Sequence, residues 1–189
     1  IVVYTSDHGD FVGNHGMVEK CAFGQNVYED ILNVPLIIKY PGKTGKGKRI
    51  SELVSLVDVL PTLIDLLDLD VPELNYPIQG ESLVDVMLND GSLGREYMIS
   101  ESWSQAAVIT KDYKLGIMLD PTPARPDLDY RDFGDMFFDM KKDPLEVENE
   151  IDNPQYQEQI ARLRGYYGDF VKNTNSTGKE EMIKQLLKN

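Results

Sequence analysis

Apolar and polar positions follow two different patterns over residues 1–90. The apolar, β-branched runs at 1–5 and 34–40 predict two strands, and continuous runs of this length favour buried strands in a parallel sheet. Apolar side chains then recur at helical spacing at Leu60, Leu63, Ile64 and Leu67. We therefore expect a helix that turns this face toward the core. Strand and helix alternate in this region, which indicates an α/β sheet.

Particular residues mark where these elements begin. Asp58 is the expected N-cap of the helix, because Pro61 then falls in the first turn, where a missing N–H is tolerated. Residues 53–57 are expected to form a short strand or to lead into the helix, and residues 27–32 to form one or two helical turns. A further short helix is predicted at 80–88, with these side chains inward: Leu83, Val86 and Met87.

A different pattern begins after the turn-forming sequence at 89–92. Short runs typical of strands lie at 97–100, 107–110, 113–118 and 136–139. Lys111 and Asp112 separate two of these runs and suit a hairpin turn.

The last long periodic segment is a helix. Asn153 is expected to cap it, with Pro154 at its first position. Its apolar side chains lie at Tyr156, Ile160, Leu163, Tyr167, Phe170 and Val171. A polar stretch follows, and then a short amphipathic turn at 182–187. This half of the chain predicts a small antiparallel sheet with a helix packed on it.

Composition and charge limit what the protein can bind. The 189 residues carry a net charge of -13, which repels a phosphate backbone, so nucleic-acid binding is not expected. A site for an anionic ester would need its own positive charge, from a metal or a lysine. No apolar run approaches the roughly 20 residues of a membrane span. Cys21 is the single cysteine, which excludes an intramolecular disulfide.

Asp7 and His8 are the first candidate functional residues. They follow the strand at 1–5, and ligands of open α/β sheets bind at the carboxyl ends of strands. A carboxylate oxygen and an imidazole nitrogen both bind divalent cations. Two ligands do not hold such an ion, so a metal site here needs further donors. The residues alone also allow Asp7 to cap a turn and His8 to pack on the loop.

Lys20 and His15 are the candidate catalytic residues, in the glycine-containing loop that follows. The loop can return Lys20 to the strand end, where its ammonium would pair with a sulfuryl or phosphoryl oxygen. His15 would be an acid, a base or a substrate contact. The alternatives for these positions are a solvated lysine and a structural histidine.

Three further features lie outside this candidate site. Cys21 has no dedicated base, so we interpret it as an unreactive thiol. The sequence at 42–49 nearly matches a phosphate-binding P-loop, but Arg49 occupies the position of the Ser or Thr that binds magnesium, and we interpret the segment as a solvated basic loop. Trp103 either lines a substrate pocket or packs against its own domain.

Several segments, taken in order, resemble the sulfatase family of the alkaline-phosphatase-like superfamily. The stretch TSDHGDFVGNHGMVEKCAFGQNVYEDILNVPLIIKYPG is similar to the family pattern of S-D-H/N-G, G-x-H-G, a lysine, Y-E-x and V-P-L-I-I. Similar segments follow in LVSLVDVLPTLIDLLDLDVP, IQGESLVDVML, ITKDYKLGIM and FFDMKKDPLEVENEIDNP. The resemblance runs from residue 1 to about residue 170.

This resemblance implies a fold and a division into domains. The fold class would be α/β, with the end of an alkaline-phosphatase-like α/β sheet followed by a small antiparallel sheet and a C-terminal helix. Residues 1–92 would be the C-terminal part of the catalytic domain, residues 93–172 a small α+β subdomain, and residues 173–189 a polar tail with a short amphipathic helix.

The resemblance also implies sulfate-ester chemistry. Asp7 and His8 would be two ligands of a divalent cation, commonly Ca2+ in this family, with Mn2+ or Mg2+ as alternatives. Lys20 would contact the sulfate group, and His15 would lie near the substrate. The family's nucleophile is a formylglycine made from the Cys or Ser of C/S-x-P-x-R, and that motif is absent here, since Cys21 is followed by Ala-Phe-Gly.

The chain is therefore expected to be the C-terminal portion of a sulfatase whose missing N-terminal half supplies the nucleophile and an aspartate pair. Alone it is expected to be inactive and to bind metal weakly. Two alternatives stay open: a phosphonate monoester hydrolase or phosphodiesterase of the same superfamily, and a non-catalytic module derived from the fold. Sugar sulfate, aryl sulfate and choline sulfate are all open as substrates, and the sequence indicates neither an oligomeric state nor a compartment.

Overall fold

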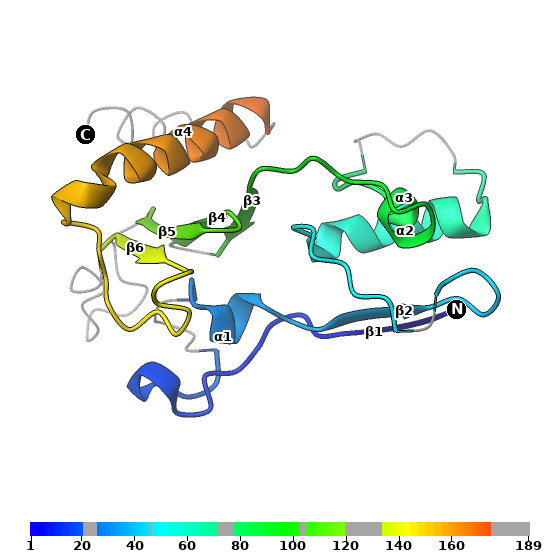
Figure 1. Ribbon diagram of the computed structural model, residues 1–189, viewed down its shortest axis with the longest axis horizontal. Coiled ribbons are helices and arrows are strands. Elements are labelled where there is room, and N and C mark those ends of the chain that lie inside the picture. The colour runs from blue at the N-terminus through cyan, green and yellow to red at the C-terminus, as the bar shows by residue number, and fades with distance from the viewer. Residues whose placement is uncertain (21–25, 46, 72–77, 103–104, 120–133, 175–189) are drawn as a thin grey trace. The chain divides into compact units, whose positions relative to one another are not determined.

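The chain folds into two compact units in the computed structural model, which describes residues 1–20, 26–45, 47–71, 78–102, 105–119 and 134–174. Unit 1 combines Ile1–Asp7 with Val34–Glu96, and unit 2 combines His8–Asn33 with Tyr97–Asn189. Both units are drawn in Figure 1.

Some predictions are not addressed by this structure. Those for Cys21, Trp103 and the amphipathic turn at 182–187 lie outside the described residues. The division into domains at 1–92, 93–172 and 173–189 stays a prediction.

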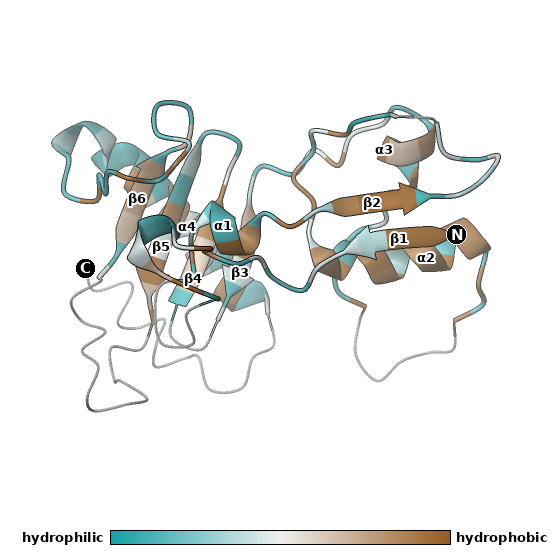
Figure 2. Cartoon of the chain, turned by 90° about the horizontal axis from the view of Figure 1, so that it is seen from below, coloured by the Kyte–Doolittle hydropathy of each residue, from teal (hydrophilic) through white to brown (hydrophobic). Residues whose placement is uncertain are grey.

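Unit 1 contains a two-stranded sheet. β1 (Val2–Thr5) pairs with β2 (Leu36–Lys39), and the two strands run antiparallel. Both predicted strands are confirmed, but their expected burial in a parallel sheet is wrong for the described residues: Val2, Tyr4 and Ile37 are 62%, 62% and 59% exposed. Figure 2 shows the apolar residues of both strands. Such a run indicates a strand, whereas the strand's direction and burial depend on its partners.

Two helices complete unit 1. α2 (Val59–Leu67) follows a 3₁₀ turn at Leu56–Asp58, and residues 53–55 lead into that turn without forming a strand. α3 (Val84–Leu88) confirms the predicted short helix. Its inward side chains form a buried cluster, as predicted: Leu83, Val86 and Met87.

α2 begins directly after Asp58, as predicted, but its capping and its buried face differ from the prediction. Ser55 is the N-cap of the preceding 3₁₀ turn, and its N–H donates to the carboxylate of Asp58 at 2.7 Å. Asp58 itself has helical backbone angles and does not cap α2 with its side chain. Thr62 is fully buried, whereas Leu60 and Leu67 are 56% and 48% exposed. The face that carries Thr62 therefore turns inward, and the Thr62 hydroxyl donates to the carbonyl of Asp58 at 2.6 Å.

Unit 2 is built on a four-stranded antiparallel sheet in the order β3–β4–β5–β6. The strands are β3 (Met98–Glu101), β4 (Gln105–Ile109), β5 (Tyr113–Met118) and β6 (Met136–Asp139). All four lie close to their predicted positions, and the predicted hairpin turn joins β4 to β5. The expected small antiparallel sheet is therefore confirmed.

α4 covers one face of this sheet (Figure 1). It spans Gln157–Asn173 after a 3₁₀ turn at Pro154–Tyr156. Asn153 accepts the N–H of Gln155 at 2.9 Å, which confirms the predicted cap. The packed side chains are Ala106, Val108, Leu115, Ile117, Phe137, Tyr156, Ile160, Leu163, Tyr167 and Val171. Neither α4 nor any other helix in the described ranges is long and apolar enough to cross a membrane.

Residues from the 8–33 segment cover the opposite face. α1 (Glu29–Leu32) confirms the predicted helical turns. Successive strand residues point to opposite faces, so β4 sends Ala106 toward α4 and Ala107 toward this segment. The buried side chains here are Phe11, Val27, Tyr28, Ile31, Ala107, Met136 and Phe138.

Candidate active site

His8 follows β1, and a backbone contact sets the orientation of its ring. Its Nδ1 atom lies 2.7 Å from the carbonyl oxygen of Gly9. A carbonyl oxygen only accepts, so Nδ1 carries a proton and donates it; in the neutral ring, the lone pair then lies on Nε2. A histidine that binds a metal through Nε2 needs this tautomer.

Asp7 is the neighbouring candidate ligand and ends the first segment of unit 1. It is exposed, and the hydroxyl of Ser6 lies 3.5 Å from its Oδ1 atom. The division between the two units falls between Asp7 and His8. The roles of both residues as metal ligands stay predictions.

Directly after His8 the chain passes close to α1. The N–H of Gly9 donates to the carbonyl of Ile31 at 2.9 Å. A Cβ atom at Gly9 would lie 1.8 Å from the carbonyl oxygen of Asp30, so no side chain fits there. Position 9 therefore requires glycine, and α1 determines where the backbone beside His8 lies.

The loop that carries Lys20 folds back on itself. Phe11 is fully buried, and its N–H donates to the carbonyl of Glu19 at 3.0 Å. A second backbone hydrogen bond joins the N–H of Gly13 to the carbonyl of Met17 at 2.9 Å. The backbone thereby returns to the beginning of the loop immediately before Lys20, which is exposed. The contact of Lys20 with a sulfate group stays a prediction.

His15 is held by α1 and by Tyr28, the residue that precedes this helix. Its ring stacks on Tyr28 with centroids 4.0 Å apart, and its Nε2 atom lies 3.4 Å from the carboxylate of Asp30. Asn14 donates to the same carboxylate at 2.6 Å. The φ of His15 is 54°, in the left-handed region. These contacts fix the direction of the ring, and its catalytic role stays a prediction.

A buried ion pair lies behind α1, and sequence reasoning gave it no role. Lys114 of β5 is fully buried, with its Nζ atom 2.5 Å from the carboxylate of Glu29 and 2.6 Å from that of Glu146. The ammonium group of Lys114 thus forms ion pairs with both carboxylates. Burial raises the pKa of Glu146 above its ordinary value, although Lys114 opposes the shift.

The sequence did contain a signal for this pair. Glu29 and Glu146 belong to the segments YED and DPLE, which carry the resemblance to sulfatases. They are 117 residues apart, so their contact could not be inferred from local spacing.

The residues present fit part of a divalent-cation site. In the described part of the chain, no group of three or more His, Cys, Asp or Glu side chains is arranged to hold a metal ion. Asp7 offers a carboxylate and His8 an imidazole of the metal-binding tautomer, which are suitable donors for such an ion. A complete site needs donors from elsewhere.

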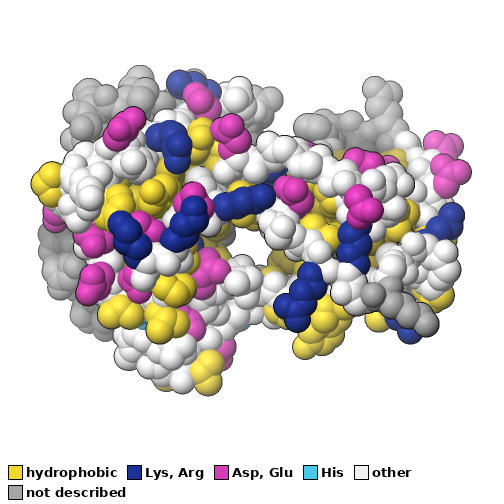
Figure 3. Space-filling model, in the orientation of Figure 1, with side chains coloured by type: hydrophobic (Ala, Val, Ile, Leu, Met, Phe, Trp, Pro, Cys, Tyr) yellow, Lys and Arg dark blue, Asp and Glu magenta, His cyan; other side chains and the backbone are white. Residues whose placement is uncertain are grey.

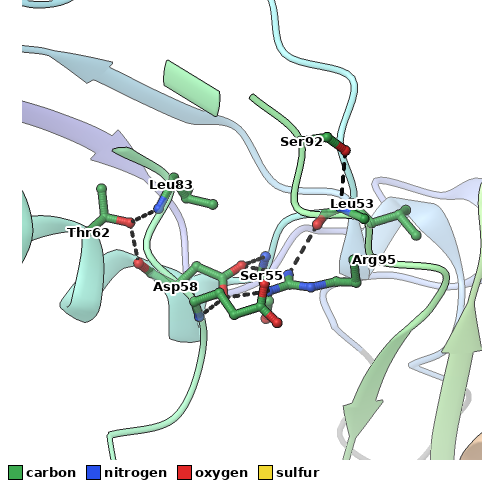
Figure 4. A network of polar contacts seen from close by, with 9 residues as sticks. Leu53, Ser55, Asp58, Thr62, Leu83, Ser92 and Arg95 are labelled. Carbon is green, nitrogen blue, oxygen red and sulfur yellow. Dashed lines mark hydrogen bonds and ion pairs between the residues drawn. The ribbon is translucent and has the colours of Figure 1, made fainter. Parts of the chain in front are cut away.

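A separate polar network stabilises unit 1 (Figure 4). The fully buried carboxylate of Asp58 accepts hydrogen bonds from Arg95 at 2.8 Å and from the N–H groups of Ser55 and Glu81 at 2.7 and 2.9 Å. Burial alone would raise the pKa of Asp58, but the hydrogen bonds from Arg95 and the backbone outweigh it and lower this pKa. The hydroxyl of Thr62 extends the network to α3 by accepting the N–H of Leu83 at 2.9 Å.

Solved structures with the same fold indicate the class of protein. One is a protein in complex with its substrate D-glucosamine-2-N,6-O-disulfate, with a TM-score of 0.70 and 27% identity over 97% of this chain and 34% of that chain. A phosphonate monoester hydrolase of Agrobacterium radiobacter has a TM-score of 0.66 over 90% of this chain and 34% of its own. At 22% identity, this second likeness is one of fold alone. The predicted fold class, the α/β architecture of sulfatases and their relatives, is confirmed.

Sequence comparison narrows this class to one family. The family described as "N-sulphoglucosamine sulphohydrolase, C-terminal" matches residues 13–169. An arylsulfatase of Clostridium perfringens (strain 13 / Type A) is 32% identical over 172 residues, which cover 87% of this chain and 32% of the relative. The chain belongs to this sulphohydrolase C-terminal family, and the resemblance to sulfatases is confirmed. The chain spans about a third of the length of the relatives that it matches.

Proposed function

We propose that the chain is the C-terminal part of a sulfatase, which hydrolyses sulfate esters with a divalent metal ion and a formylglycine nucleophile. The family match over residues 13–169 carries the proposal. The chain contains no C/S-x-P-x-R sequence, so the nucleophile would belong to another part of the protein.

Four residues of the chain would take part in the reaction. Asp7 and His8 would hold the cation, which when bound supplies positive charge for the sulfuryl oxygens and for the negative charge that develops during attack. The contact of His8 Nδ1 with Gly9 supports its role, because it fixes the tautomer. Lys20 would pair with a sulfate oxygen as a point charge. His15 would lie beside the substrate.

Local charge is central to this proposal. Acidic and basic side chains are intermixed on the face of the molecule drawn in Figure 3, and the net charge of the chain is -13. An anionic ester is therefore repelled at long range. The cation and Lys20 would have to provide the attraction at close range.

A sulfated sugar is the substrate class that we propose. One structural neighbour was solved with D-glucosamine-2-N,6-O-disulfate, and an N-acetylglucosamine-6-O-sulfatase of Bacteroides thetaiotaomicron is 30% identical over 86% of this chain and 28% of its own length. Calcium is the proposed cation, with Mn2+ or Mg2+ as alternatives.

The full-length protein tests the proposal. It should release sulfate from glucosamine 6-sulfate or an aryl sulfate, and lose this activity when a chelator removes the metal. Lys20→Ala should lower kcat/KM by about 100-fold, as expected for a charge that stabilises the transition state. Lys43→Ala, at another exposed lysine, should have no effect. Absence of sulfate release from both substrates would refute the proposal.

A phosphonate monoester hydrolase is the alternative favoured by the second structural neighbour. Hydrolysis of an aryl phosphodiester in preference to an aryl sulfate would support it. A non-catalytic module would lack both activities, and the full-length protein would then lack a C/S-x-P-x-R motif.

A further inference from the structure

Glu146 is a charged residue that is buried, while the apolar residues on either side of it are exposed. Its side chain is 1% exposed, whereas the flanking apolar residues Leu145 and Val147 are 74% and 71% exposed. The φ of Glu146 is 54°, in the left-handed region that residues other than glycine rarely adopt. The chain therefore accepts a strained backbone to place a carboxylate inside unit 2.

This carboxylate and Lys114 hold the N-terminal end of α1. Glu146 accepts the N–H of Glu29, the first residue of α1, at 2.6 Å. Lys114 Nζ lies 2.5 Å from Glu29 and 2.6 Å from Glu146. On the same face of β5, Gly116 leaves room for Val27, whose Cγ2 atom lies 3.1 Å from the position of a Cβ. The segment that ends in α1 is thus fixed closely against the sheet.

α1 in turn contacts the loop that carries both histidines. Ile31 accepts the N–H of Gly9, the residue next to His8, at 2.9 Å. Asp30 lies 3.4 Å from Nε2 of His15. The helix is therefore anchored on one side by the buried ion pair and supports the histidine loop on the other.

We infer that Lys114 and Glu146 are positioning residues: as a buried ion pair behind α1, they fix this helix and thereby fix His8 and His15. A helix of four residues is not stable by itself, so its position depends on tertiary contacts. The consequence for catalysis rests on the proposed function. The consequence for the two histidines does not depend on it.

The chain has only two histidines, which makes the inference testable by NMR. When the 189-residue chain is labelled with ¹⁵N-histidine and ¹⁵N-glycine, every imidazole signal comes from His8 or His15 and reports the tautomer and contacts of that ring. In Lys114→Met, we expect both sets of signals to shift or broaden, and the amide of Gly9 to exchange about tenfold faster. Glu146→Gln keeps an acceptor oxygen but loses the charge, so we expect the same changes in this variant. It serves as the test if Lys114→Met does not fold.

Tyr167→Phe is the matched control. Tyr167 is buried on the opposite face of the same sheet, and its hydroxyl donates to Glu101 at 2.8 Å. Its removal should leave the histidine signals and the exchange of Gly9 unchanged. A Lys114→Met protein with a lowered Tm, but with unchanged histidine signals and Gly9 exchange, would overturn the inference, because the pair would then only stabilise the fold. Lys114→Arg, which keeps the charge, should restore part of the wild-type spectrum.

Activity of the full-length protein adds a second readout. Lys114→Met should need about tenfold more Ca2+ for half-maximal sulfatase activity, as for other groups that orient metal ligands, and excess Ca2+ should restore most of kcat. Tyr167→Phe should respond to Ca2+ as the wild type does, and an unchanged Ca2+ requirement in Lys114→Met would argue against positioning. If the wild type hydrolyses no sulfate ester, the proposed function fails, while the histidine spectra still decide the positioning role.

Discussion

Gly9 is the residue whose substitution should affect the candidate site most directly. A methyl group in Gly9→Ala would lie 1.8 Å from the carbonyl oxygen of Asp30, so the backbone must move away from α1. We expect a loss of about 1–3 kcal/mol in the free energy of unfolding, measured in urea, as for other overpacked sites. Gly45→Ala is the control, because the nearest atom would be 3.9 Å away, and equal effects of both substitutions would contradict the prediction.

Asp58 should make the stability of unit 1 depend on pH. The pKa of Asp58 in the folded state is lower than the ordinary value of 3.8, because the hydrogen bonds from Arg95 and the backbone outweigh the effect of burial. Its stabilising contribution is therefore fully present above the unfolded-state pKa and is lost as the pH falls through the folded-state pKa. Asp58→Asn should cost roughly 3 kcal/mol near pH 7. Urea unfolding at several pH values should show this difference shrinking below pH 4, and a constant difference would refute the assignment.

The candidate residues themselves could be named from the sequence, but the residues that support them could not. Asp7, His8 and Lys20 belong to a short motif, in which residue type and spacing carry the chemistry. Glu146 was not assigned a role because its partner Glu29 is 117 residues away, and pairing over that distance depends on the tertiary fold.

α4 contains two glycines that lower its stability below what alanine would give at the same positions. It contains Gly165 and Gly168, and a Cβ atom at either position would meet no atom within 4 Å. Alanine restricts the unfolded chain more than glycine does, so each substitution should raise the free energy of unfolding by about 0.5–1 kcal/mol. Gly116→Ala in β5 should do the opposite, because its Cβ would lie 3.1 Å from Val27. Thermal unfolding of the three variants measures both effects.

The sequence predicted the elements of unit 2 better than those of unit 1. Strands β5 and β6 and the Asn153 cap of the 3₁₀ turn before α4 follow from local patterns, and all three are observed at the predicted residues. The apolar runs of β1 and β2 were interpreted as buried and parallel, but the described strands are antiparallel and largely exposed. The inward face of α2 was misassigned because Asp58 and Thr62 are buried through hydrogen bonds, which a hydrophobic pattern does not contain.

The molecule as a whole is expected to need more than this chain for activity. The chain offers two candidate metal ligands and no nucleophile motif, so by itself it should not hydrolyse a sulfate ester. Isothermal titration with Ca2+ or Mn2+ should give weak binding, because few ligands hold the ion. A submicromolar dissociation constant for the isolated chain would contradict this prediction.

The contact between Glu29 and Glu146 has a consequence for how the protein is made. The ribosome synthesises Glu29 117 residues before Glu146, a delay on the order of ten seconds at usual rates of translation. Until β6 has been translated, the sheet that covers Phe11 and Tyr28 lacks Met136 and Phe138, so these aromatic side chains are not fully covered. A nascent chain halted before residue 136 should therefore bind chaperones, and release from them should begin only after β6 and the following turn have been translated.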